Sequence, residues 1–376
     1  MSYIWQDKKW PRLTWQADQL TTPLGQCRFA QGQLLARIRM LGLGLDKESQ
    51  AEILVHEAVQ TSAIEGTVID PQAVRSSVVR RLGLPSAGLP PSNRYIDGVV
   101  NILLEATTHY AAQLSATRLK GWQAALFPTG FSGMQRVRVG QWRSSDLQVL
   151  SGPIGRERIH YEAPPAARIA KEMAQFFLWW HRSQRTIDGL IRAAVAHVYF
   201  VTIHPFDDGN GRIARTLTDM ALAQDEQSAP RYYSLSAQIM AERDAYYRAL
   251  ESAQQGGLDI TEWLRWFLEC MTRAITRSET MIANILARSE FWRAFAAVSL
   301  SDRQRKVVHR LLEAGPDGFV GGLTTRKYVG LTKCSRATAF REMADLIAKG
   351  LLCPSVGRGR NASYQLRWLG KAVADG

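Results

Sequence analysis

Apolar residues recur at helical spacing along most of this chain. Two such patterns lie near its start, at Phe29–Leu41 and Ser49–Glu65, and Pro23 is expected to break any helix ahead of the first. Ser49 and Glu52 have the spacing of a capping box, so the second helix is expected to begin at Ser49. The start of the chain is therefore predicted to be helical.

The middle of the chain continues this helical pattern with two interruptions. Gly and Pro crowd residues 82–92, which predicts a long loop, and a mostly helical block then covers 92–288. Inside this block, residues 140–161 hold short runs of strand-forming residues on either side of a Gly- and Pro-containing turn, which predicts a β-hairpin. The segment 187–203 is apolar on most sides and predicts a buried central helix, and another helix is expected over about 211–223.

Beyond residue 300 the pattern changes to a small basic module. Helices are predicted at Ser301–Glu313, Thr324–Val329 and Arg336–Lys349, followed by two short strands around the basic loop 357–361. This order resembles a winged helix, in which a helix-turn-helix unit carries a two-stranded wing.

The composition narrows the classes of partner. The chain has 376 residues and a formal net charge of +13, and residues 300–376 carry 14 Lys and Arg against six Asp and Glu. This excess permits an anionic partner such as a nucleotide or a nucleic acid.

No apolar run reaches membrane-spanning length and the start lacks a secretory signal pattern, so a cytoplasmic protein without membrane contact is expected. The four cysteines are scattered, which predicts neither a zinc site nor a disulfide framework.

One segment concentrates chemically active residues, and it reads His-Pro-Phe-Asp-Asp-Gly-Asn-Gly-Arg-Ile-Ala-Arg over residues 204–215. Pro205 stops the predicted buried helix, so His204 is expected at the end of a rigid support. Gly209 and Gly211 let the chain turn and approach a ligand closely just where the next helix begins. The free backbone N–H groups and the helix dipole make such a turn a cradle for anions.

The side chains of this segment suit phosphate chemistry. Asp208 offers hard oxygen ligands for a Mg²⁺ ion that bridges the phosphates of a nucleotide. Arg212 and Arg215 lie three residues apart on one helix face, and their forked donors match phosphate oxygens. His204 titrates near neutrality when unperturbed and is the candidate base for an attacking hydroxyl. The alternative is a structural turn in which the histidine and the aspartate only cap helices.

The same segment resembles the signature of the Fic family, His-Pro-Phe-x-(Asp/Glu)-Gly-Asn-Gly-Arg-x-x-Arg, at every fixed position. The resemblance implies an α-helical Fic fold and the transfer of an adenylyl group from ATP to a protein hydroxyl, with release of pyrophosphate. It also implies roles for the matching residues: a base at His204, a buried anchor at Phe206, a Mg²⁺ ligand at Asp208, an anion cradle at Gly209, Asn210 and Gly211, and phosphate-binding arginines at Arg212 and Arg215.

The predicted hairpin over 140–161 has two interpretations. It is either a ribbon that only stabilises the helices, or a free strand edge that pairs with an extended segment of a target protein. In Fic enzymes a hairpin at this position docks the target, and the string Gly140-x-Trp142-Arg143 resembles that region. The resemblance therefore favours docking of a protein whose Ser, Thr or Tyr hydroxyl accepts the adenylyl group.

A second motif lies upstream, over residues 61–66. Gly66 is a natural helix stop, so Glu65 is expected in a last turn, where its charge opposes the helix dipole and a cation across a cleft would stabilise it. The alternative is an exposed glutamate without a partner. The segment resembles the Fic inhibitory motif (Ser/Thr)-x-x-x-Glu-(Gly/Asn), with Thr61, Glu65 and Gly66 at its fixed positions. The resemblance implies that Glu65 pairs with Arg215 and blocks productive placement of the ATP γ-phosphate; in some relatives the same glutamate supports removal of the adenylyl group.

Two further groups of residues are candidates for binding. Tyr246 and Tyr247 are either adenine contacts or core aromatics. In the winged-helix prediction, the residues that would reach DNA are Arg336, Thr338 and Arg341 on the second helix of the helix-turn-helix and Arg358 and Arg360 in the wing. The alternative use of such a module is protein contact or dimerisation.

We therefore expect a mainly α protein, a Fic protein adenylyltransferase that its own N-terminal helix inhibits, with ATP as substrate and Mg²⁺ as cofactor. The expected domains are a helical N-terminal domain at 1–90, a Fic domain at 91–290 and a winged helix at 300–368, and the family resemblance suggests a homodimer. The alternative is a DNA-binding transcriptional regulator that uses the Fic fold as a nucleotide sensor. The intact base His204 favours the enzyme, because a sensor has no need of it.

Overall fold

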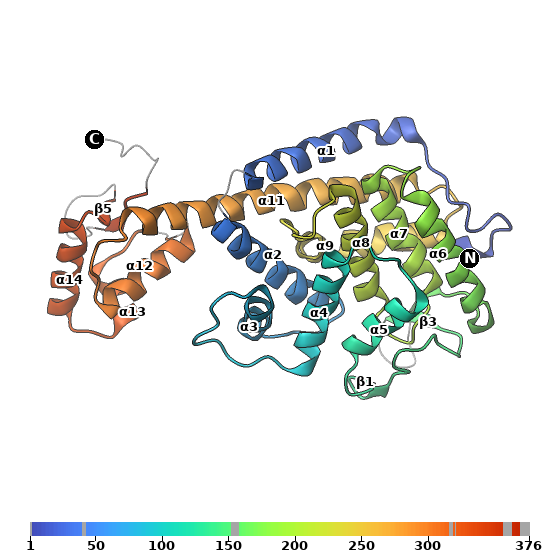
Figure 1. Cartoon of the computed structure of the whole chain (residues 1–376), viewed down its shortest axis with the longest axis horizontal. Coiled ribbons are helices and arrows are strands. Elements are labelled where there is room, and N and C mark those ends of the chain that lie inside the picture. Colours follow the sequence, from blue (N-terminus) through green and yellow to red (C-terminus); the bar gives the residue numbers. More distant parts are fainter. Residues whose placement is uncertain are drawn as a thin grey trace. The chain divides into compact units, whose positions relative to one another are not determined.

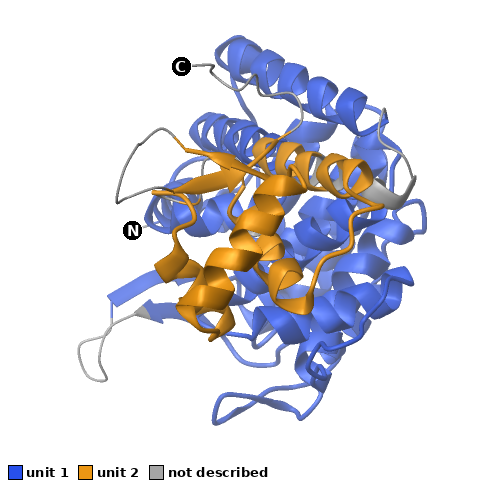
Figure 2. Cartoon of the chain, turned by 90° about the vertical axis from the view of Figure 1, so that its left-hand side faces the viewer, with its two compact units in different colours: residues 1–279 blue, residues 280–376 orange. Residues whose placement is uncertain are grey.

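The computed structural model describes residues 2–39, 43–151, 158–315, 319, 321–355 and 363–368. The chain divides into two compact units, residues 1–279 and residues 280–376 (Figure 2). Helices make up most of both units (Figure 1). The mainly α fold class is therefore confirmed, whereas the three predicted domain boundaries stay predictions.

The N-terminal region is helical, as expected, but two of its predicted boundaries are wrong. After a short 3₁₀ helix η1 (Ile4–Gln6) come α1 (Ala17–Arg39), α2 (Leu43–Ile64) and α3 (Pro71–Leu82). Pro23 lies inside α1, where the burial of one helix face, including Leu20 and Leu34, outweighs one missing backbone hydrogen bond. Ser49 lies inside α2 and is buried, so it does not cap the helix, and tertiary packing overrides this local signal.

The helices that follow surround a central pair, α7 and α8, whose bounds are given with the others. Their bounds are α4 (Arg94–Thr108), α5 (Ala116–Leu126), η2 (Ala166–Arg168), α6 (Ile169–Ser183), α7 (Gly189–Ile203), α8 (Asn210–Glu226), α9 (Leu235–Ala241), α10 (Arg243–Gln255) and α11 (Thr261–Ala294). Every residue of α7 from Leu190 to Ile203 is buried, which confirms the predicted central helix. Its apolar surface on all sides allows neighbours to cover it completely, and α8 packs along it.

The expected β-hairpin is present but shorter than predicted. Strand β3 (Gln148–Ser151) pairs antiparallel with β4 (Arg158–Glu162), and their connecting residues 152–157 lie outside the described part of the chain. Trp142 and Arg143 belong to a loop instead, because Arg143 directs its hydrogen bonds at other backbone segments. A second small hairpin, β1 (Phe131–Ser132) with β2 (Gln135–Arg136), was not predicted.

Residues 280–376 form a small unit in which three helices begin close to the predicted positions. The elements are α12 (Asp302–Ala314), α13 (Thr325–Thr332), α14 (Arg336–Ala348), β5 (Leu352–Pro354) and β6 (Tyr364–Leu366). Ser301, Thr324 and Ser335 each accept a backbone N–H through the side chain at the N-terminus of one helix. Leu323 also forms a bridge to Tyr364 beside the β5–β6 pair. This order agrees with the predicted one, and the winged-helix assignment stays a prediction.

None of the helices in the described part of the chain is long and apolar enough to span a membrane.

The contact of α4 with α5 provides a test of the packing. A Cβ atom on Gly98 in α4 would lie 1.9 Å from the backbone oxygen of Ala125 in α5. Gly98→Ala is therefore expected to lower the free energy of unfolding by about 1–3 kcal/mol or more, because the helices must separate. Gly121→Ala is the matched control, since Gly121 in α5 has no atom within 4 Å of the new Cβ. The control should raise stability by up to about 1 kcal/mol through helix propensity. Urea unfolding followed by circular dichroism measures both values, and equal effects would contradict this close approach.

Candidate active site

The site is built around the abrupt end of α7. His204 has φ = 50°, a left-handed conformation, and its backbone N–H donates to Phe200 O at 3.0 Å, which closes the last turn. The imidazole Nδ1 lies 3.1 Å from Val201 O. Because a carbonyl oxygen can only accept, Nδ1 carries the proton and the lone pair of Nε2 is left to accept one. Burial lowers the pKa of His204 to about 4, so the imidazole is neutral at physiological pH.

The loop after His204 is held rigid by its own side chains. Phe206 is buried, and its ring centroid lies 4.7 Å from that of Trp142. The Asn210 side chain donates to Phe206 O at 2.8 Å and accepts from the Phe206 backbone N–H at 3.0 Å. At Gly209, where φ is 89°, a Cβ atom would lie 3.0 Å from the Phe127 ring. The residues that the signature marks as anchor and turn therefore shape the loop.

Sequence reasoning missed Arg143, which holds this loop from outside. Its Nε donates to His204 O at 2.8 Å and its backbone N–H donates to Pro205 O at 2.9 Å. Its Nη1 donates to Ser145 O at 2.9 Å, and its Nη2 donates to Pro164 O. The sequence signal was the string Gly140-x-Trp142-Arg143, which was assigned to the hairpin. The structure shows that Arg143 is a buried support for the candidate base.

Arg212 lies in the first turn of α8 and is almost fully buried. Its Nη1 donates to the Tyr95 hydroxyl at 2.9 Å, and its guanidinium carbon lies 5.0 Å from the centre of the Phe127 ring. Its Nη2 lies 3.6 Å from Asp208 Oδ1. The Arg212 Nε atom is buried and has no hydrogen-bond partner among the described residues.

Arg215, one turn further on, is only 2% exposed and is engaged by α2. Its Nε donates to Thr61 Oγ1 at 2.8 Å and its Nη2 donates to Thr61 O at 2.9 Å. Nη2 also forms an ion pair with Glu65 Oε1 at 2.8 Å. Burial lowers the pKa of Arg215, but the Glu65 carboxylate together with Tyr246 and Tyr247 more than offsets this, and the pKa ends above its ordinary value.

Glu65 was expected in the last turn of its helix, and it lies just after the end of α2 at Ile64. Gly66 has φ = 79°, and the Thr67 N–H donates to Ser62 O at 3.0 Å, so the helix ends in a left-handed turn. A Cβ atom on Gly211 would lie 2.2 Å from Glu65 Oε1. The Glu65 carboxylate therefore lies directly against the first turn of α8, where the helix dipole favours an anion.

The end of α2 is held in place by hydrogen bonds from α9 and α10. Glu57 is buried and accepts from the Ser234 hydroxyl at 2.8 Å and from the Ser236 N–H at 3.0 Å. Ile64 O accepts from Arg243 Nη2 at 2.9 Å and from the Tyr247 hydroxyl at 3.2 Å. These contacts fix the position from which Glu65 reaches Arg215.

The two tyrosine candidates for adenine contact take different places. Tyr246 is buried, and its hydroxyl lies 3.0 Å from Nε2 of the buried His197. Tyr247 is partly exposed and bonds to the end of α2, as described above. The structure therefore places Tyr246 in the interior and Tyr247 beside the Glu65 segment.

Asp208 is the candidate metal ligand. Its side chain is 38% exposed, and its Oδ1 accepts from the Gly209 N–H at 2.5 Å. Among the described residues, no group of three or more His, Cys, Asp or Glu side chains could hold a metal ion. A single carboxylate fits Mg²⁺ that is bound mainly by waters and substrate phosphates, which is its usual setting in nucleotide enzymes.

The candidate DNA-binding residues lie in the separate unit 280–376. Arg336 and Arg341 are exposed on α14, and Phe340 is exposed between them. The Thr338 hydroxyl lies 2.9 Å from Ser335 Oγ, so Thr338 belongs to the cap of the helix. Arg358 and Arg360 lie outside the described residues.

Comparison with known proteins identifies the central region. Residues 113–222 match the model of the Fic/DOC family. They form a Fic domain. Residues 3–84 match a domain family of unknown function, DUF4172.

Relatives with curated names match part of this chain. A probable protein adenylyltransferase of Aquifex aeolicus is 29% identical over 123 residues, which is 33% of this chain and 33% of that protein. A protein adenylyltransferase of Caenorhabditis elegans is 36% identical over 95 residues, which is 25% of this chain and 17% of that protein. The matched part thus spans a third or less of each relative.

Solved structures show that the similarity extends to the fold. A Fic family protein from Desulfovibrio desulfuricans superposes with a TM-score of 0.55 at 19% identity, over 94% of this chain and 97% of that chain. A Fic domain-containing signalling protein from Bacteroides thetaiotaomicron superposes with a TM-score of 0.51 at 14% identity, over 70% of this chain and 97% of that chain. The chain therefore has the Fic fold.

Measurements of protein stability can test whether Arg143 supports the loop that carries His204. Arg143→Ala is expected to lower the free energy of unfolding by at least about 2 kcal/mol, because three backbone carbonyl groups, one of them in a fully buried bond, lose a charged donor. Arg143→Lys should recover only part of the loss, since an ammonium group cannot reach all of these acceptors. Arg138→Ala, at an exposed neighbouring arginine, is the control and should change stability by no more than about 0.5 kcal/mol. Chemical denaturation of the three variants measures these free energies of unfolding. An unchanged value for Arg143→Ala would contradict the supporting role of Arg143.

Proposed function

We propose that this chain is a protein adenylyltransferase that its own helix α2 inhibits. It transfers AMP from ATP to a Ser, Thr or Tyr hydroxyl of a target protein and releases pyrophosphate. The match of residues 113–222 to the Fic/DOC family and the curated names of the relatives support this reaction class. The single observation that carries the inhibited state is the Glu65 carboxylate, which pairs with Arg215 against the first turn of α8.

His204 is suited to the proton transfer of this reaction. The acceptor hydroxyl oxygen attacks the α-phosphorus of ATP, and its proton passes to Nε2 of His204. The bond from the α-phosphorus to the bridging oxygen breaks, and that oxygen leaves with pyrophosphate. The contact of Nδ1 with Val201 O keeps the base in the required tautomer.

The arginines of α8 suit the phosphates of the nucleotide. Arg215 Nη1, like Arg212 Nε, is a buried donor without a hydrogen-bond partner in the described part of the chain. Phosphate oxygens would satisfy these donors and replace the carboxylate at the helix N-terminus. Asp208 would hold Mg²⁺, which would supply positive charge to the phosphates when bound.

The hairpin β3–β4 suits the docking of a target protein. Its sheet has two strands, so each strand has one edge that no other described strand covers. Leu150 and Ile159 are cross-strand neighbours, and each is 49% exposed. An extended target segment could pair with such an edge through backbone hydrogen bonds.

Inhibition follows from competition for one guanidinium. Glu65 places a carboxylate where a terminal phosphate would need Arg215 and the N-terminus of α8, and like charges exclude each other there. Glu65 is also the candidate residue for the reverse reaction, which removes the adenylyl group. The same variants can be tested for this separate activity.

Labelled ATP tests both the reaction and the inhibition. Glu65→Gly is expected to raise AMP incorporation into protein by about 5- to 150-fold, the usual range of a coupling between two sites. Glu48→Gly, the same change at an exposed position of α2, is the matched control and should leave incorporation unchanged. Adding His204→Ala to Glu65→Gly should lower incorporation by about 10²- to 10⁴-fold through loss of the base. Incorporation that persists without His204 would contradict the mechanism, and equal rates for Glu65→Gly and Glu48→Gly would contradict the inhibition.

A second candidate function for the unit 280–376 rests on the outward face of α14. Its exposed residues include Arg336, Phe340 and Arg341, whereas Glu342 of the same helix is turned inward to Arg303 and Tyr328. A basic face on the second helix of a helix-turn-helix suits the major groove of DNA.

Binding to duplex DNA as a function of salt tests this second candidate. A DNA-binding module should lose affinity steeply with salt, and Arg336→Ala with Arg341→Ala should weaken binding and reduce the slope of log K against log salt by about 2. Arg326→Ala with Lys327→Ala on α13 removes the same charge and serves as the control. The absence of binding at low salt would exclude DNA as a partner.

A further inference from the structure

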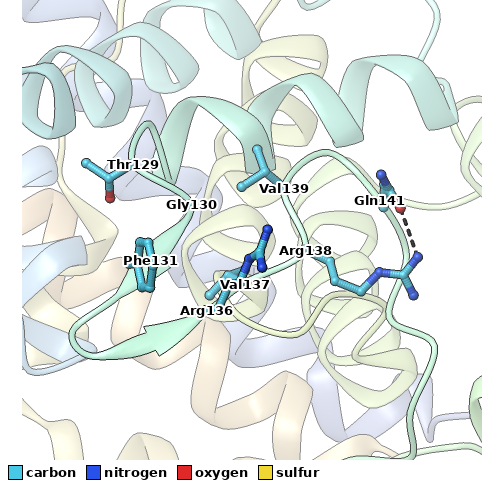
Figure 3. Close-up of a pocket in the computed structure, with 8 residues that line it drawn as sticks. All are labelled: Thr129, Gly130, Phe131, Arg136, Val137, Arg138, Val139 and Gln141. Carbon is cyan, nitrogen blue, oxygen red and sulfur yellow. Dashed lines mark hydrogen bonds between the residues drawn. The ribbon is translucent and has the colours of Figure 1, made fainter.

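We propose that a pocket beside the β1–β2 hairpin binds an acidic segment of the target protein next to its accepting hydroxyl. This inference rests on the proposed adenylyl transfer and adds to it a substrate class. The pocket has a volume of 690 Å³ and is lined by residues from the stretch 129–141 (Figure 3). It lies outside the signature segment and outside the β3–β4 hairpin.

The charge of the pocket points to an anionic occupant. Arg136 and Arg138 both line it and are exposed, and none of the described residues that line it is acidic. Arg138 donates to Gln141 Oε1 at 2.8 Å, as the dashed line in Figure 3 shows, and this partner is neutral. Within the described part of the chain, neither arginine is in an ion pair with a carboxylate. Two unneutralised guanidinium groups on one wall favour a ligand that carries carboxylates.

The apolar surface beside these arginines favours a peptide over a small anion. Phe131 lines the pocket and is 51% exposed, and Met134 at the tip of the same hairpin is 98% exposed. Exposed aromatic and methionine side chains next to arginines are typical of protein-binding surfaces. A segment with Asp or Glu beside an apolar residue therefore matches both properties of the wall.

Hydrogen bonds join the pocket to the loop that carries the candidate base. The Arg138 N–H, in the pocket wall, donates to Asp207 Oδ2 at 3.0 Å. Five residues on, Arg143 donates to His204 O at 2.8 Å. The wall and the loop thus form one bonded unit. A peptide seated in the pocket would therefore bind to the same bonded unit that carries His204.

Two measurements test the pocket separately from the chemistry. The first is fluorescence polarisation of the full chain with a labelled peptide that contains one threonine, flanking Asp and Glu residues and a leucine. Arg136→Glu with Arg138→Glu should weaken its binding at least about tenfold, the effect of losing about 1.4 kcal/mol. The control is Arg182→Glu with Arg185→Glu, which makes the same change of net charge before the start of α7, about 20 Å along that helix from His204. The second is AMP transfer by the Glu65→Gly chain to this peptide and to its Asn and Gln counterpart.

The outcomes separate the two proposals. The pocket proposal is supported if the chain prefers the acidic peptide and only Arg136→Glu with Arg138→Glu loses this preference, while ATP binding is unchanged. Equal transfer to both peptides overturns the pocket and leaves adenylyl transfer intact. Binding of the acidic peptide through Arg136 and Arg138 without any AMP transfer supports the pocket as a binding site. The same result counts against the proposed adenylyl transfer. Competition between ATP alone and the peptide for these arginines would show a nucleotide site and overturn the proposal.

Discussion

The geometry of this site depends on how the end of one buried helix is satisfied. Helix α7 is enclosed along its length and stops at His204, so its terminal carbonyl groups have no further helical turn to bond them. Arg143 supplies the missing donors to His204 and Pro205 from a loop far away in the sequence. The guanidinium of Arg143 bonds His204 O and its backbone N–H bonds Pro205 O, so one residue holds both the end of the helix and the loop that follows it.

The first turn of α8 concentrates the electrostatics of the molecule. Free N–H groups, the helix dipole and two nearly buried arginines all favour negative charge there. The chain meets this demand with its own carboxylate, Glu65, which is held close by the bonds that fix α2. An internal ligand needs no high affinity, because its local concentration is set by the fold rather than by solution. In the proposed reaction, a nucleotide would have to displace this carboxylate.

The surroundings of this site differ in kind from the site itself. Around the loop, Arg143 and Asn210 bond the backbone, whereas Arg212 and Arg215 each keep one buried donor that no described residue bonds. The two hairpins beside it expose apolar and basic side chains, including Phe131 and Ile159. Buried networks hold reacting groups in one geometry, whereas exposed strand edges and arginines can adapt to a partner. The fold thus combines a rigid loop at residues 204–215 with exposed hairpins beside it.

Local sequence determined much of this protein. The apolar surface of α7, the starts of the helices near Ser301 and Ser335, the turn at Gly66 and the segment 204–215 were all readable because each depends on neighbours within a few residues. Ser49 and Pro23 were misread for the opposite reason: packing of α1 and α2 overrode a capping signal and a helix breaker. The pairing of Glu65 with Arg215 was expected only by resemblance, since no spacing in the chain brings them together.

Only the tertiary structure decided what joins distant segments. Arg143 at the end of α7, Glu57 under α9 and the basic wall beside Asp207 are contacts across long stretches of chain. A side chain with several donors can bond many acceptors, and residue type alone does not select among them. Folding selects them, because buried polar groups must find partners wherever the packed helices place them.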